Sequence, residues 1–392
     1  MAVTFSHRTG WHREPNRLTS LLEARQKSGK PVYDLTVSNP TECGFGYPER
    51  DLAEALSNPR AFHYQPDPRG LLSARETISR YYQSRGIKVD SSRMFLTAST
   101  SEAFSILLTL LCNSGEEILV PQPSYPLFDY LAQLHDVGLK PYRLSYDHEW
   151  SIDFDSLRDA ITPATKALII INPHNPTGMF LDQSAYRIIK EIATEHSIAL
   201  IVDEVFIDYP LDPKQPIVST AGERDVLTFT LNGISKMAGL PQLKLGWIAV
   251  GGSAQAADEA SQRLEILCDT FLSVNTPVQV ALPEILKAGE SVREDILARI
   301  RANYAYMHGA VSTGSACSAL SFKGGWSGIL RMPRIKTDEQ WALELLEHKG
   351  IYLYPGYFFD FETEGHLVVS LLVPREGFQS GVSALVEFAA AH

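Results

Sequence analysis

The chain has 392 residues, of which 44% are hydrophobic and 21% are charged, and its formal net charge at pH 7 is -11. This length predicts two domains, or one large α/β domain with an appendage, and the composition excludes a disordered or fibrous protein. The acidic charge argues against nucleic acid or an anionic membrane as a partner and favours a small molecule.

The sequence shows no pattern typical of a targeting or membrane-spanning segment. The N-terminal residues lack an apolar stretch of signal-peptide length, and no run approaches the roughly 20 apolar residues that span a bilayer. The 4 cysteines are far apart, without the spacing of a zinc site or the density of a disulfide framework. We therefore expect a protein of a reducing compartment, the cytoplasm, with no bound metal.

Short apolar runs alternate with helical patterns from about residue 94 onward, as they do in a mostly parallel sheet of βα units. The predicted strands lie at 94–98, 117–123, 167–173, 199–205, 225–231 and 244–250. Several of these runs end in polar residues, glycine or proline, at the strand ends where an open α/β sheet collects its ligand-binding groups. The chemistry of the protein should therefore lie at that edge of the sheet.

The pattern changes after about residue 290. The predicted elements there are a long helix at 291–311, a strand within 324–333, a helix at 337–350, strands at 351–356 and 366–373, and a last helix. The turn-rich residues 1–50 are expected to join this C-terminal part and to help close the site. The predicted fold is therefore α/β, with a large domain over 51–288 and a smaller α+β domain made from 1–50 and 289–392.

Three motifs follow predicted strands in a set order: NPHNPTG at 172–178, DEVFIDY at 203–209 and GISKMAGLPQLKLGW at 233–247. They supply an amine at Lys236, a carboxylate at Asp203 and an amide at Asn175. A pyridoxal phosphate enzyme needs an amine to form an imine, a carboxylate to keep the ring nitrogen protonated, and donors for the phenolate oxygen. Taken singly, Lys236 could be an ordinary surface lysine, Asp203 a helix cap or a salt-bridge partner, and Asn175 part of an Asn-Pro turn. Together they favour the cofactor.

The motifs resemble those of the class I/II aminotransferases, the aspartate aminotransferase superfamily of PLP fold type I, over essentially the whole chain. The resemblance implies that Lys236 holds pyridoxal phosphate as a Schiff base, Asp203 binds the pyridinium nitrogen and Asn175 binds the phenolate oxygen. It also implies a stacking role for Tyr125. The further cofactor residues that it implies are Ser99, Thr100 and Ser101 in the phosphate turn, Ser235, Lys244, and Tyr64 reaching across the interface of a homodimer.

Three positions depart from the pattern of this family around the cofactor. Lys244 replaces a phosphate-binding arginine, which keeps the charge but loses the two-pronged planar contact. Gly233 replaces a serine or threonine that helps to bind the phosphate. Phe206 replaces the tyrosine that donates to the phenolate oxygen, at a cost of about 1 kcal/mol. We expect pyridoxal phosphate to bind despite these changes.

The largest departure concerns the substrate. Val368 stands where the family carries the arginine that clamps the α-carboxylate of the substrate. Arg331 and Arg375 are candidates to replace it, with Arg331 favoured, unless the substrate is not an ordinary α-amino acid in the ordinary pose. Ser38 and Asn39 lie in the N-terminal segment that touches the substrate in the family, and we expect them to hydrogen-bond the carboxylate.

The predicted function is transfer of an amino group from an amino acid to a 2-oxo acid such as pyruvate or 2-oxoglutarate, with Lys236 relaying the Cα proton. A pyridoxal phosphate lyase, decarboxylase or oxidase is the alternative, because the scaffold labilises a Cα bond without deciding which one. A non-catalytic regulator is disfavoured, because the lysine, the aspartate and the asparagine are all present.

Overall fold

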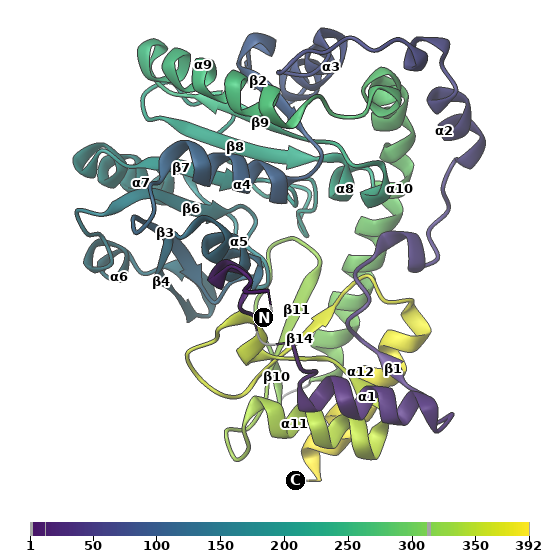
Figure 1. The fold of residues 1–392 in the computed structure, drawn as a ribbon. Helices are drawn as coiled ribbons and strands as arrows, with labels where there is room; N and C mark the ends of the chain where they lie inside the picture. The colour runs from purple at the N-terminus through teal and green to yellow at the C-terminus, as the bar shows by residue number, and fades with distance from the viewer. Residues whose placement is uncertain (1–2, 12, 312–314, 392) are drawn as a thin grey trace.

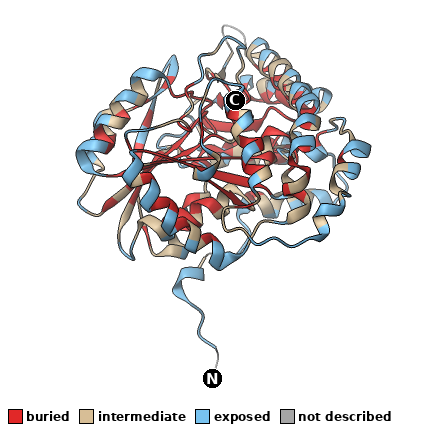
Figure 2. Ribbon diagram, turned by 90° about the horizontal axis from the view of Figure 1, so that it is seen from above, coloured by how far each residue is buried: buried red, intermediate tan, exposed pale blue. Residues whose placement is uncertain are grey.

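A computed structural model describes residues 3–11, 13–311 and 315–391. Figure 1 shows a larger part built around a long sheet and a smaller part beneath it, with helix α10 (Thr276–Ala310) running along one side of both. Burial is densest in the middle of the molecule, and the helices expose their outer faces (Figure 2). None of the described helices is long and apolar enough to span a bilayer.

The larger part is organised around an eight-stranded sheet. Its strands in spatial order are β2 (Met94–Thr97), β9 (Gly246–Gly251), β8 (Thr228–Gly233), β7 (Ala199–Asp203), β6 (Thr165–Ile171), β3 (Glu117–Gln122), β4 (Gly138–Asp147) and β5 (Glu149–Ile152). The run from β8 to β4 is parallel, whereas β9 is antiparallel to both of its neighbours and β5 is antiparallel to β4. The predicted α/β class with a mostly parallel sheet is confirmed.

Helices cover this sheet because its central strands are apolar on both faces. They are α3 (Leu72–Gln83), α4 (Thr100–Leu111), α5 (Leu127–His135), α6 (Phe154–Asp159), α7 (Gln183–His196), α8 (Ile234–Met237) and α9 (Ala254–Phe271), whereas α2 (Glu49–Leu56) packs on α10. In α7, the Asp182 side chain caps the first turn by accepting from the backbone of Ala185, and Ile189 and Ile192 are buried. Capping and an apolar stripe thus define this helix.

The smaller part contains two small sheets. One is the antiparallel series β10 (Ser318–Ala319), β11 (Ser327–Arg331), β14 (His366–Ser370) and β13 (Tyr354–Pro355). The other pairs β1 (Tyr33–Asp34) in parallel with β12 (Ile351–Tyr352). Its helices are α1 (Arg17–Lys27), α11 (Asp338–Glu344), which continues as a π-helical turn over Leu345–Lys349, and α12 (Arg375–Ala390). The N-terminal segment therefore joins this part from α1 onward.

Two features differ from the sequence-based expectations. Helix α10 begins at Thr276 rather than at residue 291, because Asn275 caps it by accepting from the backbone of Val278 and a proline fits its first turn. The expected domain boundary at 288/289 falls inside this helix, and the division into two domains stays a prediction. Before α1, the 3-10 turn His7–Thr9 packs against α5 of the larger part.

The two parts share a core where they meet. One cluster of buried side chains combines Leu168 and Val202 of the large sheet with Ile329 and Val368 of the smaller one. Buried apolar contacts of this kind are the main force that keeps packed layers together. They hold β11 and β14 opposite the strand ends of the large sheet.

Candidate active site

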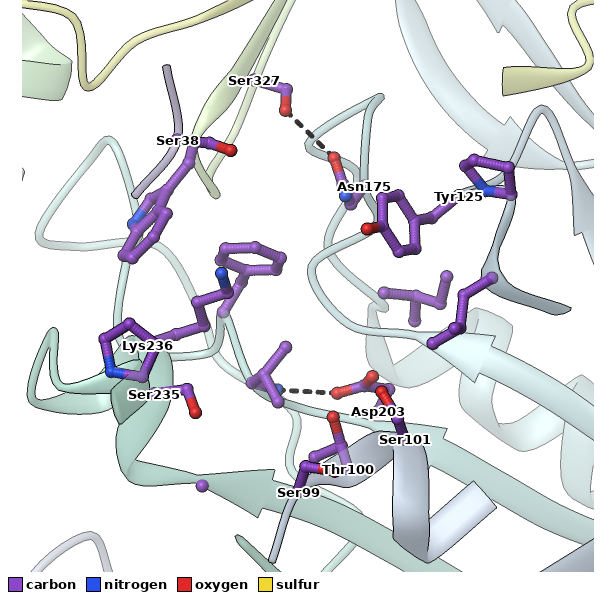
Figure 3. A pocket seen from close by; sticks show the side chains of 18 of the residues that line it. Ser38, Ser99, Thr100, Ser101, Tyr125, Asn175, Asp203, Ser235, Lys236 and Ser327 are labelled. Carbon is purple, nitrogen blue, oxygen red and sulfur yellow. Dashed lines mark hydrogen bonds between the residues drawn. The ribbon is translucent and has the colours of Figure 1, made fainter. Parts of the chain in front are cut away.

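A cavity of about 530 Å³ lies between the two parts, at the carboxyl ends of β6, β7 and β8. Asn175 follows β6, Asp203 ends β7, and Lys236 lies in α8 directly after β8. Parallel strands bring their carboxyl ends to one edge, so the three motifs meet there as expected (Figure 3). The predicted residues that line the cavity are Ser38, Ser99, Thr100, Ser101, Tyr125, Asn175, Asp203, Ser235, Lys236 and Lys244.

The Asp203 carboxyl is an acid in an apolar setting. Asp203 is 9% exposed, and its Oδ1 accepts a hydrogen bond of 3.0 Å from the backbone N–H of Val205. Burial raises the pKa of Asp203 to about 6, against the opposing effects of that hydrogen bond and of Lys236. No ion pair to Asp203 exists among the described residues. The carboxylate therefore has a place for a cationic partner in the cavity.

Lys236 projects into the same cavity (Figure 3). Burial lowers the pKa of its amine, and the charge of Asp203 opposes this effect. The Nζ atom lies 4.8 Å from the ring centre of Trp326 and 5.7 Å from that of Phe206. The Tyr209 hydroxyl donates to the backbone carbonyl of Lys236 at 2.5 Å and so fixes the turn that carries it. A lysine of lowered pKa in a defined position can act as a nucleophile and a base.

Asn175 is oriented by a partner from the smaller part. The Ser327 hydroxyl donates to the Asn175 Oδ1 atom at 3.0 Å, which leaves the amide N–H groups of Asn175 free to donate into the cavity (Figure 3). Tyr125 lies beside this pair in the same view and is about half exposed. Ser327 was not expected from the sequence, and the only signal for it is its place at the start of a predicted strand.

The start of α4 forms the third side of the cavity. Ser99 caps the helix by accepting from the backbone N–H of Glu102 at 3.1 Å, and Thr100 and Ser101 line the cavity. The free N–H groups and positive dipole end of a helix of this length favour an anion.

Two glycines leave room beside this helix start. A Cβ atom on Gly246 would lie 3.2 Å from the carbonyl carbon of Ser99, and one on Gly233 would lie 3.0 Å from the Gly246 Cα. Strands β8 and β9 therefore approach closely at Gly233, and a side chain there would require the backbone of β9 to shift by a few tenths of an ångström.

Four predicted residues do not line the cavity. Arg331 is exposed at the far end of β11, about 13 Å along the strand from Ser327, and lies outside this cavity, so its contact with the substrate stays a prediction. Asn39 accepts from the backbone of Thr41 and caps a turn instead. Arg375 begins α12 outside the cavity. Tyr64 is 67% exposed and lies outside the cavity of its own chain.

The substrate side of the cavity is hydroxyl-bearing and aromatic. Trp326 lines it, and the residues there that the sequence did not mark as substrate contacts are Thr36, Ser327, Tyr354, Phe358, Phe359 and Ser370. Among the described residues that line the cavity, the cations are Lys236 and Lys244, and there is no arginine. Val368 lines it as an apolar residue of β14, 2% exposed. A substrate carboxylate would meet neutral donors here.

Comparison with known proteins agrees with this geometry. The sequence model of the family described as aminotransferase class I and II matches residues 32–385. The chain belongs to this family.

Characterised relatives of this aminotransferase include the glutamate-pyruvate aminotransferase AlaA of Haemophilus influenzae, 28% identical over 98% of this chain and 96% of that protein. The alanine aminotransferase of Mycobacterium bovis is 27% identical over 93% and 86%. Among solved structures, an alanine aminotransferase from Pyrococcus furiosus covers 96% of both chains with a TM-score of 0.87 and 25% identity. The protein is therefore an enzyme that transfers amino groups.

Enzymes of this family use pyridoxal phosphate, and the residues present fit it. The buried Asp203 has no cationic partner among the described residues, as a carboxylate facing a protonated ring nitrogen would require. The Lys236 amine projects into the same space, and the helix start at Thr100 offers N–H groups to a phosphate. The cavity therefore offers a carboxylate for the ring nitrogen, an amine for the aldehyde and N–H groups for the phosphate of the cofactor.

Proposed function

We propose that Lys236, Asp203 and Asn175 hold pyridoxal phosphate by its aldehyde carbon, its ring nitrogen and its phenolate oxygen. In this assignment Tyr125 covers one face of the ring, and the phosphate lies at the start of α4. The supporting observation is that groups from β6, β7, α8 and α4 converge on one cavity. The remaining phosphate contacts are assigned to Ser99, Thr100, Ser101, Ser235 and Lys244.

The bound cofactor supplies an electron sink for the substrate carbon that carries the amino group. Asp203 keeps the ring nitrogen protonated, because the buried carboxylate and the pyridinium stabilise each other. Lys236, once released from the cofactor, takes the proton from the substrate Cα, a task for which its lowered pKa suits it. Trp326 and Phe206 exclude water around the amine, since both rings lie beside it.

We further propose that the amino donor is a monocarboxylic amino acid with an apolar or aromatic side chain, and that a monocarboxylic 2-oxo acid such as pyruvate accepts the amino group. The observation that carries this proposal is the absence of arginine from the described cavity lining. A single α-carboxylate can be received by Ser38 and the Asn175 amide, whereas a second carboxylate would be desolvated without a cation. The aromatic wall suits an apolar side chain.

The test is a set of single-turnover measurements on the holoenzyme. Alanine, phenylalanine, tyrosine, glutamate and aspartate are mixed with the enzyme, and the change from the pyridoxal to the pyridoxamine form of the cofactor is followed by absorbance. We expect alanine or an aromatic amino acid to react at least tenfold more efficiently than glutamate, and pyruvate to reverse the change. A preference for glutamate would refute the substrate proposal. Consumption of an amino acid without the pyridoxamine form would favour a lyase or oxidase.

We also propose a homodimer in which Tyr64 of each subunit reaches the phosphate in the other subunit's cavity. Phe62, Tyr64, Phe271 and Leu272 are apolar or aromatic and strongly exposed in the single chain. Their two segments lie side by side, because the backbone N–H of Asp67 donates to the Ser273 hydroxyl. Exposed apolar side chains that gather in this way are typical of an interface.

Mixed dimers test this arrangement. We expect Lys236→Ala and Tyr64→Ala enzymes each to have low activity alone. The two variants are unfolded together and refolded to form mixed dimers. If Tyr64 acts across the interface, each mixed dimer has one intact site, and activity returns. If Tyr64 acts within its own chain, both sites of the mixed dimer stay defective and the proposal fails.

We propose the cytoplasm as the location of the enzyme. The support is that Cys43, Cys112, Cys268 and Cys317 are all free thiols, as in a reducing compartment. Fractionation of the source cells, followed by detection of the protein with an antibody, tests this, and recovery outside the cytoplasmic fraction would contradict it.

A further inference from the structure

A second groove of about 470 Å³ lies between the two parts, separate from the catalytic cavity. None of the described residues lines both spaces. One wall comes from the end of β3 and from β4 and β5, and includes Arg143 and Trp150. The other comes from the smaller part and includes Arg331, Arg334 and Phe361. Arg331, expected from the sequence to serve the substrate, is thus placed in this groove.

The groove is rich in positive charge although the whole chain is acidic. Its lining has three arginines and one acid, Glu362, in a protein of net charge -11. Arg143 pairs with Asp153 at 3.1 Å. The Arg331 side chain has no ion pair or hydrogen bond among the described residues, and the Arg334 side chain has one hydrogen bond of 3.3 Å, to the Thr363 hydroxyl. The two guanidiniums therefore have unused donors and no acidic partner.

A histidine beside these arginines adds no positive charge. Burial lowers the pKa of His366, and the charges of Arg334 and Arg331 lower it further, so that its ring is neutral at pH 7. Its Nδ1 atom donates to the backbone carbonyl of Thr363 at 2.8 Å. The charge available to a ligand therefore comes from the guanidiniums.

Aromatic rings form the apolar part of the groove. Trp150 is 9% exposed, and its indole N–H has no hydrogen-bond partner among the described residues. Its ring lies 5.2 Å from that of Tyr146 and 6.1 Å from that of Phe361. Phe361 in turn stacks on His366 at 4.4 Å. A flat ligand ring can pack against such a surface.

We propose that this groove binds a small dianion attached to a flat ring, such as an aryl phosphate or an aromatic dicarboxylate. The guanidiniums of Arg331 and Arg334 present planar forks that match a phosphate or a pair of carboxylates, and Trp150 and Phe361 contact the ring. Both arginines are exposed, and they differ from most surface arginines in that they lie together in one groove, without an ion pair among the described residues and beside the aromatic wall of Trp150 and Phe361.

The position of the groove gives an occupant a route to the catalytic site. Pro123 lines the groove, and Tyr125, two residues later, lines the catalytic cavity. Phe361 lines the groove, and Phe359 lines the cavity. The two segments are joined, because the backbone N–H of Ser124 donates to the carbonyl of Phe359 at 2.8 Å. A dianion in the groove therefore contacts both segments that end at the active site.

The test uses calorimetric titration of the holoenzyme, whose own phosphate site is occupied by the cofactor. Phenyl phosphate is the first probe, and phthalate and benzoate are compared with it. We expect saturable binding of one phenyl phosphate or one phthalate per chain, at least tenfold tighter than benzoate, which carries a single charge. The tighter binder of phenyl phosphate and phthalate shows whether the groove prefers a phosphate or a pair of carboxylates. Absence of saturable binding, or equal binding of benzoate, would overturn the proposal.

Matched variants locate the binding. Arg331→Gln with Arg334→Gln removes both forks, and Arg187→Gln with Arg263→Gln removes two exposed arginines elsewhere, one in α7 and one in α9. We expect the first pair to weaken phenyl phosphate binding about tenfold or more and the control pair to leave it unchanged. Arg331→Lys, which keeps the charge without the fork, provides a milder variant if the double variant loses its cofactor absorbance. Equal affinity in wild type and the groove variants would place the dianion elsewhere and refute the assignment.

Discussion

Replacing Asp203 with asparagine in the cofactor-free enzyme should stabilise the fold while damaging the site. Burial raises the pKa of this carboxyl from the ordinary 3.8 to about 6. The folded protein therefore binds the proton more tightly than the unfolded chain does, and the free energy of unfolding falls as the pH rises past 4. The difference in pKa corresponds to about 3 kcal/mol at pH 8 and to about half of that at pH 5. Asparagine cannot ionise and avoids this loss.

Urea unfolding of the wild type and of Asp203→Asn, both freed of cofactor, measures the effect at pH 5 and pH 8. We expect the variant to be the more stable protein, by about 3 kcal/mol at pH 8 and by about half as much at pH 5. The buried Glu204, whose pKa is raised by burial to about 7, is common to both proteins. Saturating pyridoxal phosphate should stabilise the wild type more than the variant. Equal stabilities at both pH values would refute the reasoning.

Three further substitutions test separate parts of the site. Gly246→Ala places a Cβ atom 3.2 Å from the Ser99 backbone and should raise the dissociation constant of pyridoxal phosphate about tenfold, as measured by fluorescence titration. Ser327→Ala removes the hydroxyl that donates to Asn175 and should lower kcat/KM about fivefold, from the loss of one hydrogen bond of about 1 kcal/mol. Lys236→Ala should abolish both the covalent attachment of the cofactor, detected by reduction with borohydride and mass measurement, and turnover.

Each of these substitutions has a matched control. Gly46→Ala adds a methyl group where no atom lies within 4 Å, so a similar loss of cofactor affinity in both variants would contradict the steric argument. Ser327→Thr keeps the hydroxyl and should recover most of the lost kcat/KM. Lys244→Ala should weaken cofactor binding but leave the covalent attachment intact, and attachment lost in Lys244→Ala but kept in Lys236→Ala would reverse the assignment.

Much of the large sheet could be predicted from the sequence because its central strands are buried on both faces. Runs such as β6 and β7 are nearly continuous in apolar residues and end in the polar motifs. The strands β4 and β5 at the edge of the sheet were not predicted: β4 is partly exposed and contains Pro141, which weakens the strand signal. The early start of α10 was missed because Pro277 and Pro283 interrupt the helix signal, although Val278, Leu282 and Ile285 already follow helical spacing.

The cofactor side of the site was more predictable than the substrate side. Lys236 and Asp203 each lie directly at the end of a strand, so the order of the strands alone places them together. Ser327 and Tyr354 come from short strands of the smaller part, and their positions depend on how that part packs on the large sheet. Arg331 shows the same limit: its strand was predicted, but which end of the strand faces the cavity was not.

The pairing of β1 with β12 joins Tyr33 to Ile351, near opposite ends of the chain. Strand β1 leaves the ribosome long before β12 and thus waits for it before the two can pair. The large sheet, whose strands lie between these segments, can assemble during that wait, since domains generally fold as units and local contacts form before distant ones. The walls that carry Ser38, Ser327 and Tyr354 are then completed together, so the cavity closes at the end of folding.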